Sequence, residues 1–164
     1  MDITCSPGNK KAGLTTILEN RLGRARAAAK AGTLPLTGVF RYGKPITSRG
    51  FTFMDRPGHD PASVTGQIAS GGTLIAFRTG RGLAFGSKPA PTVMIASNTE
   101  MFLRQRDDMD LNAGTIVSDG ARIKAVGRAI HDLLLRIALG ERSKSEAMGL
   151  GDHEFVPLQV GAVM

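Results

Sequence analysis

The sequence predicts an α/β fold in which a mainly parallel sheet is covered by flanking helices, a Rossmann-like layered architecture. Short apolar runs recur at 51–54, 73–77 and 92–96, and stretches with helical periodicity follow them. Loops rich in glycine and proline separate these stretches. Alternation of strands and helices is typical of parallel sheets, because a crossover between parallel strands has room for a helix. A length of 164 residues suits one domain with a short arm.

The first fifty residues predict a basic arm. Apolar residues at helical spacing indicate a long N-terminal helix over 13–31, and residues 35–50 are typical of a connector with a short strand near 38–42. This segment carries nine Lys or Arg and two acidic residues, which accounts for the whole net charge of +7. We therefore divide the chain into a basic helical arm and connector, 1–50, and an α/β domain, 51–164, which together form one compact unit.

The middle of the chain predicts a βαβ unit. After the strand at 51–54, Asp60 is expected to cap a helix whose first residue is Pro61, because aspartate accepts free amide hydrogens and proline fits the first helical position. Gly71 ends this helix before the strand at 73–77. A strand, a helix and a second strand in this order form a βαβ unit, whose geometry makes the two strands parallel.

The remaining elements follow the strand at 92–96, after which Ser97, Asn98 and Thr99 can each cap a helix. We expect a helix near 100–107 and a weak strand at 116–117. An amphipathic helix is expected from its cap Asp119 to Gly140, followed by a short helix near 143–148 and an extended tail.

Composition excludes several classes. No apolar stretch is long enough for a membrane span, and no basic cap with an apolar run marks a secretory signal. Cys5 is the only cysteine, so an internal disulfide and a multi-cysteine zinc site are excluded, and a cytoplasmic protein is expected. The basic segment lacks interleaved aromatic residues for base stacking, so nucleic-acid binding ranks last among the functions considered.

Ligands of parallel sheets bind outside the carboxyl ends of the strands. We therefore expect the loops 55–60, 78–91, 97–99 and 118–120 to gather at one edge and to hold the site. Polar residues elsewhere are expected to be surface groups.

The first of these loops offers Asp55 and His59. His59 can act as a general base or a metal ligand, and Asp55 as a metal ligand or an orienting partner. The alternative is that Asp55 only holds the turn and that His59 is an exposed side chain.

The second loop has the residues of an anion site. Gly80, Gly82 and Gly86 allow sharp turns that present amide hydrogens, and Arg81 and Lys88 add positive charge. Its spacing matches neither a phosphate-binding P-loop nor a dinucleotide fingerprint, so a carboxylate or a phosphate is the expected ligand class. The alternative is a glycine loop with solvated charges.

Five groups of residues, in this order along the chain, also resemble the altronate dehydratase and galactarate dehydratase family. They are Ser6-Pro7-Gly8-Asn9-Lys10 with Gly13-Leu14-Thr15-Thr16, Asp55-Arg56-Pro57-Gly58, Thr79-Gly80-Arg81-Gly82 with Phe85-Gly86, Ser97-Asn98-Thr99, and Asp110-Leu111-Asn112-Ala113-Gly114. The chain departs from the family at Thr4-Cys5, where Asn-Pro is frequent, and at Ala113, where cysteine is frequent.

The resemblance implies a hydro-lyase that acts on sugar acids with a divalent metal, iron or manganese. A related branch is similar to sulfolactate sulfo-lyase, which expels sulfite in place of water. The resemblance covers only the C-terminal part of the family's usual polypeptide. It therefore implies a fragment, a truncated gene or one piece of a split enzyme that needs upstream domains or a partner subunit.

Our working hypothesis is β-elimination of water from a hydroxy-acid carboxylate, in which positive charge stabilises the enolate. His59 is the candidate base, and Asp55 the candidate metal ligand or orienting group. The substrate-binding candidates are Thr79, Gly80, Arg81, Gly82 and Lys88 for carboxylates, and Asn98 and Asn112 for hydroxyls. A non-catalytic companion subunit that binds acidic sugars is the second hypothesis. A homo-oligomer is expected.

Overall fold

The computed structural model describes residues 33–156. The helix predicted over 13–31 and the end of the predicted tail lie outside these residues. Within them, no helix has both the length and the apolar character that crossing a membrane requires.

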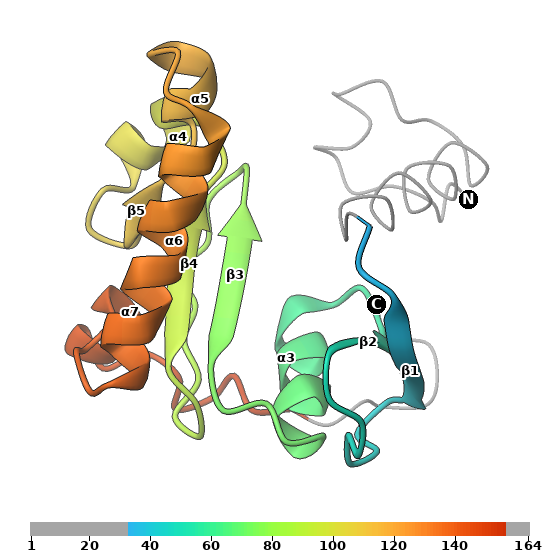
Figure 1. The fold of residues 1–164 in the computed structure, drawn as a ribbon. Coiled ribbons are helices and arrows are strands. Elements are labelled where there is room, and N and C mark those ends of the chain that lie inside the picture. Colours follow the sequence, from blue (N-terminus) through green and yellow to red (C-terminus); the bar gives the residue numbers. More distant parts are fainter. Residues whose placement is uncertain (1–32, 157–164) are drawn as a thin grey trace, which may run out of the picture.

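The described strands form two parallel sheets (Figure 1). β1 (Leu36–Arg41) pairs with β2 (Phe51–Asp55), and this two-stranded sheet joins the predicted connector to the segment that follows it. The second sheet has the order β3 (Ile75–Thr79), β4 (Thr92–Ala96) and β5 (Leu111–Asn112). All three pairings are parallel, which confirms the predicted α/β class.

Helices flank the sheets. α3 (Asp60–Ala69) stands between the two sheets in Figure 1, and α6 (Ile123–Ala138) runs along β4. α4 (Thr99–Arg104) and α5 (Thr115–Ser118) lie past the upper ends of β3 and β4, and α7 (Lys144–Ala147) lies toward their lower ends.

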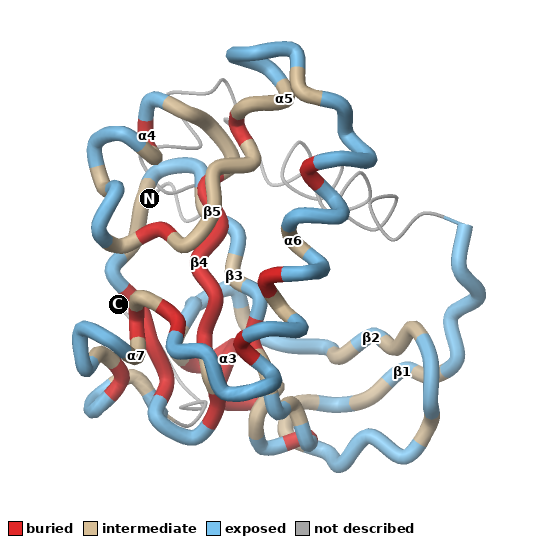
Figure 2. Tube along the Cα trace, turned by 60° about the vertical axis from the view of Figure 1, so that its left-hand side comes forward, coloured by how far each residue is buried: buried red, intermediate tan, exposed pale blue. Residues whose placement is uncertain are grey.

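β4 is the centre of the fold, because every one of its residues is buried (Figure 2). Side chains alternate across a strand, so β4 supplies two apolar cores. Val93 and Ile95 pack against α6 through Leu133 and Ile137. On the opposite face, one cluster collects residues of α3, α4, β3, β4 and the loops between them: Val64, Ile75, Phe85, Ala90, Met94, Ala96, Met101 and Met109.

α3 connects the two sheets through contacts on different sides. The Tyr42 hydroxyl, just after β1, donates to the Ala62 carbonyl at 2.6 Å, and the Tyr42 ring lies where a Cβ on Gly66 would stand. Val64 points into the core beside Ile75 of β3. The helix therefore fixes the small sheet to the large one.

The predicted βαβ unit is wrong in its pairing. β2 pairs with β1 and not with β3, and a cavity of about 390 Å³ lies along β2 and β3, with Ile46, Phe53 and Leu74 in its wall. The physical reason is that an apolar run identifies a strand but does not specify which other strand pairs with it. β1 occupies one edge of β2, and the backbone of Ile46 bonds to Ser70 at the end of α3, at 3.0 Å.

Two helix starts differ from the prediction. His59 is the N-cap of α3, so Asp60 is its first residue and makes no side-chain cap. Arg122 is the N-cap of α6, and Asp119 instead ends α5. Neither helix has a side chain that accepts a hydrogen bond from its first free amides, so a candidate capping residue in the sequence did not mark where the helix begins.

The predicted strand at 116–117 is also wrong, because these residues belong to α5 and Val117 is 88% exposed. The third strand of the sheet is β5, only two residues long, which pairs with Ile95 and Ala96. A pair of apolar residues has no periodicity to distinguish a strand from a helical turn.

Asp110 attaches β4 to the C-terminal part of the fold. Its backbone amide donates to the Met94 carbonyl at 2.9 Å, and its Oδ2 accepts from the Met94 amide at 2.7 Å. Its Oδ1 accepts from the Lys144 amide at the start of α7, at 2.8 Å. One carboxylate therefore holds a fully buried strand and a helix N-terminus together, where negative charge is favourable.

We expect Asp110→Ala to lower the free energy of unfolding by about 2–4 kcal/mol, because it leaves two backbone donors without their charged acceptor. Urea denaturation measures this. Asp107→Ala, at an exposed position of the same segment, is the control and should change stability by less than about 0.5 kcal/mol. Equal losses in both variants would contradict the role of Asp110.

Candidate functional site

The carboxyl edge of the three-stranded sheet brings several predicted site residues together. β3 ends at Thr79 and is followed by Gly80, β4 is followed by Ser97 and Asn98, and β5 ends at Asn112. Because these strands are parallel and adjacent, their ends meet at one edge. We call the turn Thr79–Gly82 the arginine turn, since Arg81 is its exposed cation.

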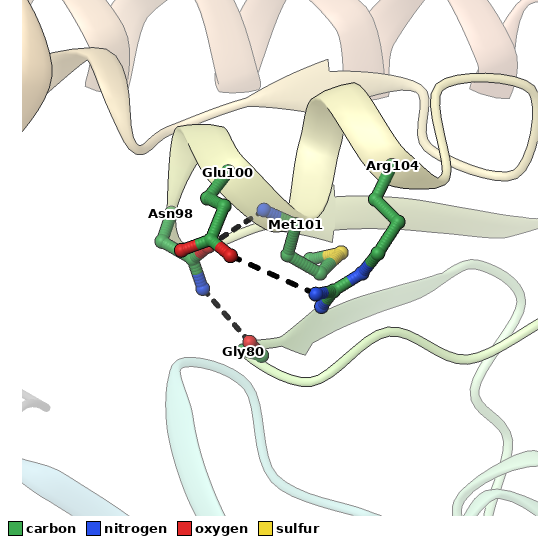
Figure 3. Close-up of polar contacts among 5 residues, drawn as sticks. All are labelled: Gly80, Asn98, Glu100, Met101 and Arg104. Atoms are coloured by element: carbon green, nitrogen blue, oxygen red, sulfur yellow. Dashed lines mark hydrogen bonds and ion pairs between the residues drawn. The ribbon is translucent and has the colours of Figure 1, made fainter.

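Asn98 ties this turn to the next element (Figure 3). Its Oδ1 accepts from the Met101 amide at 2.8 Å and caps α4, while its Nδ2 donates to the Gly80 carbonyl at 2.8 Å. Both ends of the carboxamide therefore contact the protein itself. Its predicted role as a ligand for sugar hydroxyls stays a prediction, with one N–H left for a ligand.

Asn112 makes an equivalent tie on the other side. Its Oδ1 accepts from the Gly114 amide at 2.9 Å, and its Nδ2 donates to the Thr99 hydroxyl at 3.1 Å. The Thr99 and Ser118 hydroxyls are 2.7 Å apart. The loops after β4 and β5 are thereby joined by neutral amide and hydroxyl groups.

The arginine turn is fixed at further points. The Gly82 amide donates to the Thr79 hydroxyl at 3.2 Å, and the Ser97 amide donates to the Thr79 carbonyl at 2.9 Å. Gly82 has a φ of +93°, a conformation that favours glycine, and the carboxamide of Gln105 fills the space where its Cβ would stand. The Gln105 Oε1 is buried there without a hydrogen-bond partner.

Gly114 makes the closest backbone approach at this edge. A Cβ on Gly114 would lie 2.2 Å from the Thr99 nitrogen and 2.4 Å from the Asn98 carbonyl carbon. Only glycine lets the loop after β5 pack on the start of α4. Sequence reasoning assigned no role to Gly114, although this residue stands in a group that carries the resemblance, because the weak strand was expected at 116–117 and not directly before it. No motif singled out Gln105.

An ion pair lies beside the arginine turn on α4. Glu100 Oε1 and Arg104 NH1 are 3.8 Å apart, one helical turn apart in sequence, and Figure 3 shows both side chains on the side of α4 that faces Gly80. The side chains are 89% and 61% exposed, so the pair adds little to stability.

Asp55 and His59 lie on a different part of the fold. Asp55 ends β2 in register with Arg41, and His59 precedes α3; both are exposed. Between them, Arg56 bonds through its guanidinium to the Ser63 hydroxyl and to the Pro57 carbonyl, which holds the loop on α3. This loop therefore belongs to the two-stranded sheet, and the arginine turn to the three-stranded one.

Lys88 also stands apart from the arginine turn. The loop after β3 turns back along the sheet before it reaches Phe85. The Phe85 ring contacts Phe77 in β3, and the Phe85 carbonyl accepts a hydrogen bond from the Ser145 hydroxyl. Lys88 Nζ lies 3.4 Å from Asp152 Oδ1, and the loop then enters β4 at its amino end. A loop between parallel neighbours must travel the length of the sheet, so its two halves serve opposite edges.

The described residues do not form a metal centre by themselves. No group of three or more His, Cys, Asp or Glu side chains within 33–156 is arranged to hold an ion. Asp55 and His59 supply only two such groups, and both are exposed.

The cavity beside β2 is a separate feature. It is lined by Ile46, Phe51, Thr52, Phe53, Met54, Arg56, Gln67, Gly72, Leu74 and Ile75. None of the predicted catalytic or substrate-binding residues lines it.

Comparison with known proteins identifies relatives across the chain. The family model for D-galactarate/altronate dehydratase, C-terminal, matches residues 1–163. Galactarate dehydratase (L-threo-forming) of Escherichia coli K12 is 38% identical over 146 residues, which cover 88% of this chain and 27% of that protein. Altronate dehydratase of Bacillus subtilis 168 is 35% identical over 83% of this chain and 27% of that protein.

A third relative is named for a different activity. The (2R)-sulfolactate sulfo-lyase subunit beta of Chromohalobacter salexigens is 30% identical over 91% of this chain and 37% of that protein. The chain thus spans about a quarter to a third of the length of the curated relatives that it matches.

We expect Gly114→Ala to destabilise the fold by about 3 kcal/mol or more, because the new Cβ meets backbone atoms that cannot move aside. Thermal or urea unfolding measures this. Gly127→Ala is the matched control, since a Cβ there, within α6, meets nothing within 4 Å. It should stabilise the protein by about 1 kcal/mol through helix propensity. Destabilisation by both variants would contradict the close approach of Gly114.

Proposed function

This chain belongs to the D-galactarate/altronate dehydratase C-terminal family, and we propose that it is the part of a sugar-acid dehydratase that binds the substrate carboxylate. The observation that carries the proposal is the arginine turn, which presents Arg81 between two glycines at the carboxyl edge of the sheet. An arginine on a fixed turn suits a carboxylate, because its planar guanidinium can donate two parallel hydrogen bonds.

The neighbouring groups suit the rest of a sugar acid. Thr99, Asn112 and Ser118 supply hydroxyl and amide groups at the same edge of the sheet as the turn. A polyhydroxy chain that extends from a carboxylate at Arg81 would meet groups that both donate and accept hydrogen bonds. A phosphoryl dianion offers only acceptors, so it would use the donors of these groups and leave their acceptors without a ligand partner.

The reaction proposed is the elimination of water. A base removes the proton on the carbon next to the carboxylate, and the carbon–hydrogen electron pair forms the enolate. This pair then forms the carbon–carbon double bond as the bond to the hydroxyl on the following carbon breaks. The hydroxyl takes up the proton that the base had removed and leaves as water. Arg81 stabilises the negative charge that develops on the carboxylate oxygens. His59 is the proposed base, with Asp55 as its orienting group. Both residues lie on the two-stranded sheet, apart from the arginine turn, so the proposal requires the complete enzyme to bring His59 to the substrate.

In this proposal, catalysis also requires the part of the family polypeptide that lies outside the region shared with this chain. The matched relatives are about three to four times as long as the region that they share with this chain. The two-stranded sheet carries neighbouring apolar side chains that are largely exposed, with Val39 at 65% and Phe53 at 54%. We propose that the upstream part of the family polypeptide covers this face, either as a domain or as a separate subunit.

The second candidate function is a companion subunit that binds acidic sugars without catalysing their dehydration. The observation that favours it is that one relative, which matches 91% of this chain, is named as a subunit.

We expect Arg81→Ala to weaken the binding of galactarate about tenfold or more, because a charge-assisted bidentate contact is lost. Isothermal titration of the purified chain measures the dissociation constant. Arg128→Ala removes the same charge from an exposed position on α6 and should leave the constant within about twofold. Equal weak affinity for wild type and Arg81→Ala would end the carboxylate role of Arg81.

We expect His59→Ala to lower kcat about a hundredfold or more when the chain replaces the C-terminal quarter of the Escherichia coli galactarate dehydratase, because a general base contributes this much. The rate of galactarate consumption is the measurement. His131→Ala, at an exposed position on α6, is the control. Unchanged turnover would exclude His59 as the base, and a chimera that binds galactarate without turnover would favour the companion subunit.

A further inference from the structure

We infer that Asn98 is a positioning residue that holds the arginine turn, and with it Arg81, in the geometry that a sugar-acid carboxylate requires. The identity of the ligand in this inference rests on the proposed function. That Asn98 holds the turn rests on contacts within the chain. Asn98 reaches from the start of α4 to the Gly80 carbonyl at 2.8 Å, directly before Arg81 (Figure 3).

The turn needs such a tie because glycines flank its cation. Gly80 and Gly82 have wide conformational freedom, and each fixed residue of this kind loses much entropy on ordering. The Gly82 amide is held by Thr79, and Gln105 fills the space over Gly82. On the other side of Arg81, the bond from Asn98 is the side-chain contact that fixes Gly80.

Asparagine is the side chain that does both tasks at once. The carboxamide has an acceptor for the Met101 amide and a donor for the Gly80 carbonyl on opposite ends of one rigid plane. The start of α4 and the arginine turn are therefore coupled. Serine also caps helices well, but its hydroxyl lies closer to its own backbone and cannot span to Gly80.

This difference makes Asn98→Ser the decisive variant, because it keeps a cap for α4 and removes the tie to the turn. Glu100→Gln is the matched control, since Glu100 is 89% exposed on the same helical turn. Its change removes the ion pair with Arg104 and the negative charge in the first turn of α4, but keeps the bond from Asn98 to Gly80. Arg81→Ala is the second variant needed for a double-mutant cycle with Asn98→Ser.

The first measurement is amide hydrogen exchange of the full chain without ligand. We expect exchange in the segment 79–84 to be about fivefold faster or more in Asn98→Ser, because the turn opens locally more often. The segment 123–138 in α6 should exchange as in wild type, and Glu100→Gln should change neither segment. Unchanged exchange at 79–84 in Asn98→Ser overturns the positioning role.

The second measurement is a double-mutant cycle for galactarate binding with Asn98→Ser and Arg81→Ala. We expect Asn98→Ser to weaken binding about three- to tenfold in the wild-type background and by less than about twofold in Arg81→Ala, since it acts through Arg81. The same loss in both backgrounds overturns the inference and makes Asn98 a direct ligand.

The two measurements separate the inference from the proposed function. If the wild-type chain does not bind galactarate, the proposed function and the ligand half of the inference both fail. Hydrogen exchange still decides whether Asn98 holds the turn. If galactarate binds and depends on Arg81 but Asn98→Ser changes neither exchange nor affinity, only the inference fails.

Discussion

The candidate site depends on the two-ended contact between the Asp110 carboxylate and the backbone. By accepting from Met94 at one oxygen and from Lys144 at the other, Asp110 fixes where the chain meets the buried strand β4. The strand β5 is only two residues long and its ladder is correspondingly short. Its register beside β4 therefore relies on the side chain that precedes it, and that register determines where Asn112 stands.

From Asp110 the constraint passes along the edge of the sheet by short steps. Asn112 bonds to Thr99 and Gly114, and Gly114 packs against the backbone that joins Asn98 to Thr99. Asn98 then reaches Gly80. Networks in which each polar group has a partner rigidify a structure, whereas a missing member leaves its neighbours unsatisfied. The position of Arg81 is thus coupled to residues that lie far from it in sequence.

The sequence was sufficient for the strands with continuous apolar runs and for α6, because these patterns report burial directly. It was insufficient wherever tertiary contacts decide. The strand β5 was not predicted, because it is short and its position depends on the charged residue Asp110 and not on an apolar run. The βαβ prediction failed because apolar runs do not specify which strands pair. The expectation that Lys88 joins Arg81 overlooked the distance that a loop between parallel neighbours must cover.

The position of Asp55 and His59 on the small sheet bears on how a complete enzyme would be assembled. Side chains two residues apart on a strand share a face, so Asp55 lies on the same face of β2 as Phe53, beside the register neighbour Val39. A two-stranded sheet is marginal without a covering element. Polypeptide that buries Val39 and Phe53 would also enclose Asp55 and reduce the dielectric around it, where charges interact more strongly. The same contact that stabilises the small sheet would then also cover Asp55, at the start of the loop that carries the proposed base His59.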